Sequence, residues 1–367
     1  EGFNRINDFV YLGEYILIPF FQQKVTDEMK DAVITVLENE KFILGESVFK
    51  FEEEFAKYIG TEYAVAVNSG NSALQLSLFA LGLGKNSKII TSTNSFIASA
   101  NCILMVGGIP ILTDINSDDG NIDISNISES PDAIIPVHIY GNPCDFESIK
   151  AKSEEGKIPI IEDACQAHGA EYNNKKVGSL GDVGCFSFYP TKNMTVGGDG
   201  GMVTTNNEDV AKTIISLRDN GRQTHSEHDK LGYTMRLNTI NAAIGRVQLK
   251  QLDEMNGKRR EIAQIYKKYI GEENFLIENS KGISVYHQIV LKHKNRDKII
   301  ECLKKNEIGY AIHYQIPIHK QPLYLSYGFN FPKSDDFCTK ILSLPSHPDL
   351  TNENIKIICE TINEVVS

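Results

Sequence analysis

Short, continuous apolar runs alternate with helical patterns over much of the chain. The runs at residues 88–92, 109–114 and 133–137 are separated by segments in which helix-forming residues or apolar positions at helical spacing occur. Strands that are apolar on both faces are typical of a parallel sheet with helices on both sides. The pattern therefore predicts an α/β fold with three layers and a mostly parallel central sheet.

The chain is too long for one ordinary hydrophobic core. With 367 residues, we expect a large α/β domain over residues 19–250 and a smaller α+β domain over residues 251–367. Residues 1–18 match no motif, and we expect an N-terminal arm or extension there.

Individual elements follow from the same patterns. Thr26 is a suitable N-cap for a helix with Met29, Val36 and Leu37 on one face. The patterns predict further helices at residues 48–58, 73–83, 96–105, 145–155, 209–218, 239–270, 297–306 and 352–366. They predict further strands at residues 63–68, 158–162, 183–187, 202–205, 284–291 and 310–314.

Charge and cysteine content argue against several classes of protein. The formal charge of −11 leaves no basic face for nucleic acid, and no apolar run reaches membrane-spanning length. The seven cysteines form no CxxC pair, which suits a reducing compartment, and no secretion signal is recognisable. His313, His319 and His347 lack the spacing of a metal site on one helix. We expect a cytoplasmic protein without a metal, a nucleic-acid partner or a membrane partner.

Several polar or small residues follow the predicted strands. In open α/β sheets, ligands bind beyond the carboxyl ends of the strands, where Phe96, His138 and Asp163 fall. The turn Ser69-Gly70-Asn71-Ser72 joins a strand to a helix and would offer free N–H groups to a phosphate. An ordinary turn explains this stretch about as well, so both interpretations stay open.

Two acids close the apolar strand in the stretch IIEDACQAHGA. Carboxylates are costly to bury, so at least one of Glu162 and Asp163 should have a cationic partner. Alternation along the strand directs them to opposite faces, which allows one a structural role while the other faces the cleft.

Lys192 lies in FSFYPTKNMTVGGDGGMVTT, between a strand and a glycine cluster. A short constrained stretch on each side would aim its amine, which makes it a candidate nucleophile, although most lysines are solvated surface charges. The glycine cluster is not a nucleotide loop, because neither GxGxxG nor GxxxxGK[ST] lies between a strand and a helix.

Three segments together resemble a known family. In order and spacing, SGNSAL at Ser69, EDACQAHGA at Glu162 and FSFYPTKNMTVGGDGG at Phe186 are similar to the pyridoxal phosphate (PLP) dependent sugar aminotransferases of the DegT/StrS family. These are fold-type I enzymes. The resemblance runs from about Ile18 to the C-terminus and implies a homodimer with sites at the subunit interface.

The resemblance implies roles for individual residues. Lys192 would bind PLP as an internal aldimine and move protons, and Asp163 would pair with the pyridine nitrogen. Further cofactor contacts would come from Phe96 against the ring, Gln166 at the phenolic oxygen, and Gly70, Asn71 and Ser187 at the phosphate. The family commonly has Thr at position 71 and Asn at 234, and the resemblance implies that Thr234 would contact the phosphate from the partner subunit through its hydroxyl.

The expected reaction is transfer of an amino group, from glutamate, to a keto group of a nucleotide-linked deoxysugar. Arg236 and His319 are candidate substrate residues. A sugar dehydratase, a cyclitol aminotransferase and a non-catalytic PLP-binding regulator are alternatives. Lys192 argues against the dehydratase, since relatives with that activity have histidine at its position.

Overall fold

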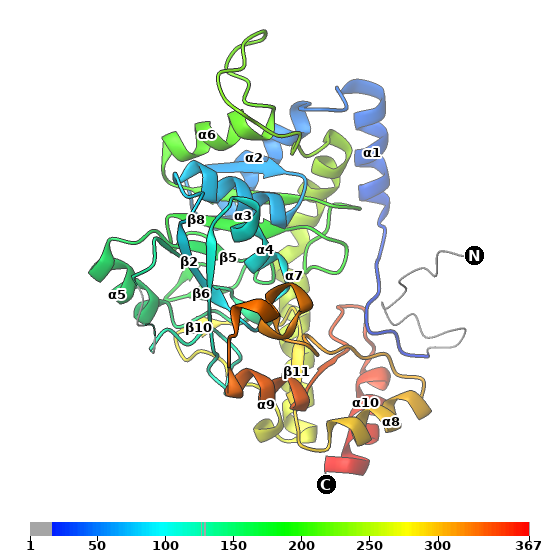
Figure 1. The fold of residues 1–367 in the computed structure, drawn as a ribbon. Coiled ribbons are helices and arrows are strands. Elements are labelled where there is room, and N and C mark those ends of the chain that lie inside the picture. Colours follow the sequence, from blue (N-terminus) through cyan, green and yellow to red (C-terminus); the bar gives the residue numbers. More distant parts are fainter. Residues whose placement is uncertain (1–16, 126, 128–129, 367) are drawn as a thin grey trace, which may run out of the picture.

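The computed structural model describes residues 17–125, 127 and 130–366 (Figure 1). The predicted arm over residues 1–18 therefore lies almost wholly outside the described part. Ile18, which is described, pairs with Ile308 and is buried near the C-terminal end of the fold.

Seven strands form the central sheet, in the order β1-β9-β8-β5-β4-β2-β3; isolated parallel bridges between residues 134 and 160 and between 137 and 163 join its two halves. β9 runs antiparallel to both of its neighbours, and the remaining pairs are parallel. The prediction of a mostly parallel sheet is thus confirmed. The strands are β1 (Tyr63–Val67), β2 (Lys88–Ser92), β3 (Ile109–Thr113), β4 (Ala133–Ile135), β5 (Ile161–Asp163), β8 (Val183–Ser187) and β9 (Gly201–Thr205).

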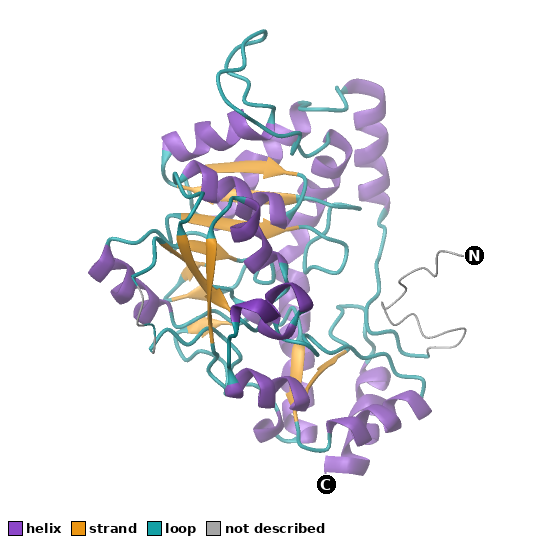
Figure 2. Ribbon diagram, in the orientation of Figure 1, coloured by secondary structure: helices purple, strands orange, loops and turns teal. Residues whose placement is uncertain are grey.

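Helices cover both faces of this sheet, as Figure 2 shows for the orange strands between purple helices. On β1, Val65 and Val67 pack in the core with α3, α4 and α6, whereas Ala66 packs in a second core with α2 and α7. This confirms the predicted three layers. The helices are α1 (Asp27–Asn39), α2 (Glu46–Ile59), α3 (Gly70–Ala80), α4 (Ala98–Met105), α5 (Phe146–Gly156), α6 (Glu208–Arg218) and α7 (Thr239–Ile270).

Residues after α7 build a separate hydrophobic core around β11 (Ile289–Lys292) and β12 (Ile341–Leu344). The end of α7 contributes Ile262, Tyr266 and Ile270 to it. The predicted domain boundary at 250 lies inside α7 and stays a prediction. The helices of this part are α8 (Arg296–Lys305), α9 (Pro332–Lys340) and α10 (Asn352–Val366).

Short elements complete the fold. They are β6 (Glu171–Tyr172), β7 (Lys175–Lys176), β10 (Gly282–Ile283), and the 3₁₀ helices η1 (Ile139–Gly141), η2 (Glu272–Asn274), η3 (Ile318–Lys320) and η4 (Pro322–Tyr327).

Two predicted strands differ from the structure: the strand predicted over 284–291 forms only from residue 289, as β11, and the strand predicted over 310–314 is wrong. Residues 284–288 do not continue β10, because Ser284 and Val285 both bond to the carbonyl of Gly141 and Tyr286 has a positive φ of 45°. Residues 310–314 form only a single bridge, between Ala311 and Ser343. In both segments tertiary contacts override the apolar pattern.

Most other boundaries agree closely with the patterns. Thr26 caps α1 by accepting a hydrogen bond from the N–H of Met29 at 3.3 Å. The helix expected from residue 73 begins at Gly70 instead, because Ser69 accepts a hydrogen bond from the N–H of Ser72. That shift brings the predicted phosphate turn into the first turn of α3.

Candidate functional site

The candidate residues gather beyond the carboxyl ends of β1, β5 and β8. Parallel strands end at the same edge of a sheet, which brings the segments after Val67, Asp163 and Ser187 together. Gly70 in particular lies very close to Ser187 and Cys165. A Cβ atom on Gly70 would lie 2.7 Å from Ser187 Cβ and 2.8 Å from Cys165 Sγ, so only glycine fits there.

Asp163 lies in the last position of β5, with 4% of its surface exposed. Its Oδ2 accepts a hydrogen bond from Ser99 Oγ at 2.6 Å, and its Oδ1 accepts one from the N–H of Cys165 at 3.2 Å. Both oxygens therefore act as acceptors, as expected of an ionised carboxylate.

Glu162, the preceding residue, points to the other side of the strand. Its side chain is fully buried and accepts hydrogen bonds from the backbone N–H groups of Gly178, Leu180 and Gly181, each at 2.7 Å. His138 Nε2 lies 3.0 Å from Glu162 Oε2. These partners belong to the loop after β7 and to the segment after β4, so Glu162 ties parts of the fold together.

Lys192 follows β8 after a short turn, in which its N–H bonds to the carbonyl of Tyr189. Burial lowers the pKa of the Lys192 ammonium, and the nearby Cys165 and Asp163 offset part of that shift. The lowered pKa increases the fraction of free amine, which is the form that attacks a carbonyl.

Asn193 fixes the backbone next to Lys192. Its Nδ2 donates to Asn256 Oδ1 on α7 at 2.8 Å and to the carbonyl of Val285 at 3.0 Å, and its Oδ1 lies 3.1 Å from His287 Nδ1. Sequence patterns did not single out this network, because its members are far apart in the chain.

Gln166 is buried between two tyrosines. Its Oε1 accepts a hydrogen bond from the N–H of Tyr140 at 2.9 Å, and its Nε2 donates to the Tyr314 hydroxyl at 3.2 Å. Phe96 is 56% exposed, and its ring lies 6.3 Å from that of Tyr314. The exposed face of Phe96 is available to a planar ligand at the edge of this group.

His168 is fully buried and His313 is partly buried, and the charge of Lys192 acts on both. Burial and, as a smaller cause, the Lys192 charge lower the pKa of His168 to about 3 and that of His313 to about 4. Neither ring nitrogen of His168 has a partner of good geometry among the described residues, although the Ser187 backbone is near enough to oppose the shift slightly. Both rings are therefore neutral near pH 7.

The side chains of the other predicted residues have partners of their own. Thr234 Oγ1 donates to Asn220 Oδ1 at 3.1 Å, and Arg236 pairs with Asp219 at 2.6 Å. Both lie at the base of the segment after α6, where Thr234 forms a bridge with Asp219 and Arg236 forms one with Val67 at the end of β1. The middle of this segment extends away from the body of the molecule in Figure 1. Asn71 Nδ2 donates to Met105 Sδ at 3.5 Å.

His319 is 2% exposed and has a partner at each ring nitrogen. Nδ1 lies 2.7 Å from Thr93 Oγ1, and Nε2 lies 3.1 Å from Asp335 Oδ1. A substrate would have to displace one of these partners to reach the imidazole.

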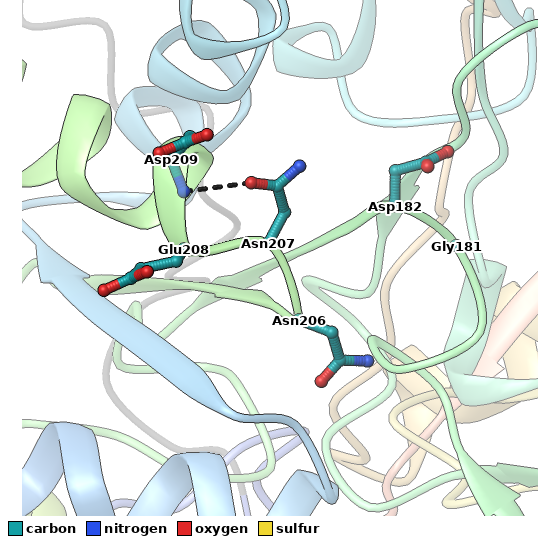
Figure 3. A pocket seen from close by; sticks show the side chains of 6 residues that line it. All are labelled: Gly181, Asp182, Asn206, Asn207, Glu208 and Asp209. Carbon is teal, nitrogen blue, oxygen red and sulfur yellow. Dashed lines mark hydrogen bonds between the residues drawn. The ribbon is translucent and has the colours of Figure 1, made fainter.

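A hollow of about 530 Å³ lies at the opposite end of β8 (Figure 3). It is lined by Gly181, Asp182, Asn206, Asn207, Glu208 and Asp209. Its polar groups stabilise the fold, since Asp182 accepts from the N–H of Ile160 and Asn207 caps α6. This hollow is therefore separate from the candidate site.

The described residues contain neither a candidate metal centre nor a candidate membrane span. No group of three or more His, Cys, Asp and Glu residues is placed to hold a metal ion. None of the helices in the described ranges is long and apolar enough to cross a membrane.

The model of the DegT/DnrJ/EryC1/StrS aminotransferase family matches residues 23–363. The chain belongs to this family. A relative from Pseudomonas aeruginosa named UDP-2-acetamido-2-deoxy-3-oxo-D-glucuronate aminotransferase is 33% identical, and the match covers 95% of this chain and 99% of that protein. A relative from Geobacillus stearothermophilus named pleiotropic regulatory protein is 34% identical, with 93% and 95% covered.

Solved structures of family members have the same fold. DesV from S. venezuelae matches with a TM-score of 0.90 and 31% identity, over 93% of this chain and 94% of that one. The PMP form of the putative sugar aminotransferase Spr1654 from Streptococcus pneumoniae matches with a TM-score of 0.90 and 26% identity, over 95% and 97%. The predicted family, the fold class and the prediction of an aminotransferase are confirmed.

Proposed function

We propose that this chain is a PLP-dependent enzyme that transfers the amino group of glutamate to a keto group of a nucleotide-linked deoxysugar. The observation that carries the proposal is the buried Asp163 carboxylate beside the Lys192 amine, at the same sheet edge as Gly70 and Ser187.

These residues fit PLP. The absence of a Cβ atom on Gly70 lets the first turn of α3 approach Ser187 closely, so that backbone N–H groups and the Ser187 hydroxyl lie at the same place. Ser69 is the N-cap of α3, and its side chain accepts a hydrogen bond from the N–H of Ser72. The N–H groups of Gly70 and Asn71 lie in the first turn of the helix and therefore have no partner within α3. With the Ser187 hydroxyl, these dipoles would hold the phosphate of an anionic cofactor in an acidic protein. PMP, found in the Streptococcus pneumoniae structure, is the amino form of PLP and supports the same cofactor here.

Each residue then has one task. PLP supplies the electron sink that stabilises negative charge at the carbon that loses a proton. Lys192 would hold the cofactor covalently through Nζ and, once released, carry the proton at that atom. Asp163 would keep the proton on the ring nitrogen, Phe96 would cover a ring face, and Gln166 would bond the phenolic oxygen.

The substrate class rests on the relatives. The Pseudomonas aeruginosa relative is named for a UDP-linked 3-oxo sugar, and a sugar nucleotide is the substrate class we propose for this chain. Arg236 and His319 remain candidate substrate contacts. A dehydratase or a cyclitol aminotransferase would use the same fold. A regulatory role is a further alternative, because the Geobacillus stearothermophilus relative is named pleiotropic regulatory protein.

Product analysis separates these possibilities. We would incubate the purified chain with a panel of nucleotide-linked keto-sugars, with and without glutamate, and analyse the products by mass spectrometry. The proposal predicts an amino sugar that forms only with glutamate, together with loss of the product in Lys192→Ala. A dehydrated product formed without glutamate would support the dehydratase, and the absence of any product with a PLP-loaded chain would support the regulator.

We also propose that the active unit is a homodimer in the cytoplasm. Exposed apolar side chains gather over α1, α2 and the turn between them, at Ile34, Leu37, Phe42, Ile43 and Phe49, and a second copy would bury them. The loop that carries Thr234 extends from the body and would reach the partner's phosphate site. The seven free thiols suit a reducing compartment. Light scattering after size-exclusion chromatography tests the dimer, and an active monomer would contradict it.

A further inference from the structure

Two buried serines lead to the carboxylate of Asp163. Ser99 Oγ donates to Asp163 Oδ2 at 2.6 Å, and Ser95 Oγ lies 2.7 Å from Ser99 Oγ. Ser95 is 3% exposed and Ser99 1%, so water competes little for these hydrogen bonds. The 2.6 Å contact is short, as expected for a hydroxyl that bonds to an ionised oxygen.

The chain of hydrogen bonds has one direction. A serine hydroxyl carries a single hydrogen, and Ser99 gives its hydrogen to Asp163. Ser95 must therefore donate to Ser99. The second oxygen of Asp163 accepts from the N–H of Cys165, so Asp163 is the acceptor in both of these hydrogen bonds.

The same short segment carries Phe96. Ser95 and Ser99 flank it in sequence, and the N–H of Ser99 bonds to the carbonyl of Phe96 at 3.1 Å. The first turn of α4 is thus tied to β5 through the carboxylate. Ser99 thereby fixes the position of the exposed Phe96 ring relative to the buried Asp163 carboxylate.

We propose that Ser99, supported by Ser95, is a positioning residue for Asp163. This inference rests on the proposed function. Ser99 holds Oδ2 in one orientation, which leaves the remaining lone pairs of the carboxylate to the ring nitrogen of PLP. Its hydrogen bond stabilises the ionised carboxylate, so the shared proton stays on that nitrogen.

The test compares four variants of the full chain. Ser99→Ala removes the donor, Ser95→Ala removes its support, and Ser99→Thr retains the hydroxyl. Ser77→Ala is the matched control, because Ser77 is also fully buried and its hydroxyl donates to the carbonyl of Ala73 at 2.7 Å, within α3. Each apo form is titrated with PLP labelled with ¹⁵N in the ring, which yields the dissociation constant and the ¹⁵N chemical shift.

Loss of a hydrogen bond to a charged group weakens binding about tenfold or more, which is the effect expected for Ser99→Ala. Its ¹⁵N resonance should move toward that of an unprotonated ring. Ser95→Ala should weaken binding by roughly twofold to threefold, while Ser99→Thr and Ser77→Ala stay within about twofold of the unmodified chain. Loss of buried packing alone would lower the melting temperature without moving the ¹⁵N shift.

A Ser99→Ala chain that binds PLP with unchanged affinity and ¹⁵N shift would overturn the inference. Equal effects of Ser99→Ala and Ser77→Ala would overturn it too. If Ser99→Ala does not fold, the other two variants still test the inference, because PLP binding should weaken in Ser95→Ala and stay nearly unchanged in Ser99→Thr. Failure of the unmodified chain to bind PLP is a different result, because it would refute the proposed function itself.

Discussion

Glu162 and Asp163 are neighbours on β5, yet their surroundings differ. Glu162 is surrounded by donors from the backbone, and His138 completes the set. The N–H of Cys144 donates to His138 Nδ1, so that nitrogen carries no proton and the proton on Nε2 points to Glu162. Asp163 instead has one hydroxyl, one N–H and the nearby Lys192. One carboxylate has its acceptor capacity filled by the fold, while the other keeps capacity for a ligand.

The largest expected effect is on the Glu162 side. Glu162→Gln would direct an amide nitrogen at backbone N–H groups that need an acceptor. We expect the free energy of unfolding to fall by about 3 kcal/mol or more. Chemical denaturation of the apo chain, followed by circular dichroism, measures this. A loss below about 1 kcal/mol would show that the backbone donors find other acceptors.

Asp163→Asn should affect activity much more than stability, in contrast to Glu162→Gln. The fold should keep its stability within about 1 kcal/mol, because Ser99 and Cys165 can still bond to the amide oxygen or adjust to it. Transaminase activity should fall by about 100-fold or more, since the ring nitrogen loses its charged partner. Initial rates at saturating glutamate measure this. An active Asp163→Asn enzyme would break the distinction between the two carboxylates.

The pH dependence of stability gives a third test, at the buried His168. Burial lowers the pKa of His168 to about 3, against an unfolded value near 6.5, so the unfolded chain binds the extra proton first. The stability is fully present above about pH 6.5. It is lost as the pH falls toward 3, by about 1.4 kcal/mol per pH unit for this group.

His168→Phe should remove that contribution and flatten the curve by one proton between pH 6 and 4. The rings of Phe186 and Phe188 already surround the site, so an aromatic replacement is tolerated. Unfolding free energies at several pH values measure the slope. An unchanged slope would contradict the assignment of a neutral buried His168.

Tyr314→Phe should have the smallest effect. It removes the acceptor of Gln166 Nε2 and leaves the ring contact with Phe96. We expect a loss of about 1 kcal/mol or less in unfolding free energy and a few-fold weaker binding of PLP. Thermal unfolding and a PLP titration measure the two. A loss of activity as large as that of Asp163→Asn would show that Tyr314 takes a direct part in the reaction.

Much of the fold follows from local patterns in the sequence. The apolar runs predicted the strands of the central sheet, and Thr26 and the long period from residue 239 predicted the bounds of α1 and α7. The opposed directions of Glu162 and Asp163 followed from strand alternation alone. Residues 284–288 of the strand predicted over 284–291, and the whole strand predicted over 310–314, are wrong because contacts with distant residues decide the conformation there.

The residues that surround the site could not be predicted as well from the sequence. Ser99 has no motif of its own, and its contact with Asp163 spans 64 positions in the chain. Tyr314 reaches Gln166 across 148 positions. Such contacts arise only when the layers pack. The nearest signal for Ser99 was its place one helical turn after Phe96.

The central claim is that Lys192 and Asp163 share a PLP site. Reduction of the PLP-loaded chain with borohydride, followed by proteolysis and peptide mass spectrometry, tests it most directly. We predict a pyridoxyl group on the peptide that contains Lys192, and none in Lys192→Ala. A pyridoxyl group on another lysine, with Lys192 unmodified, would contradict the claim.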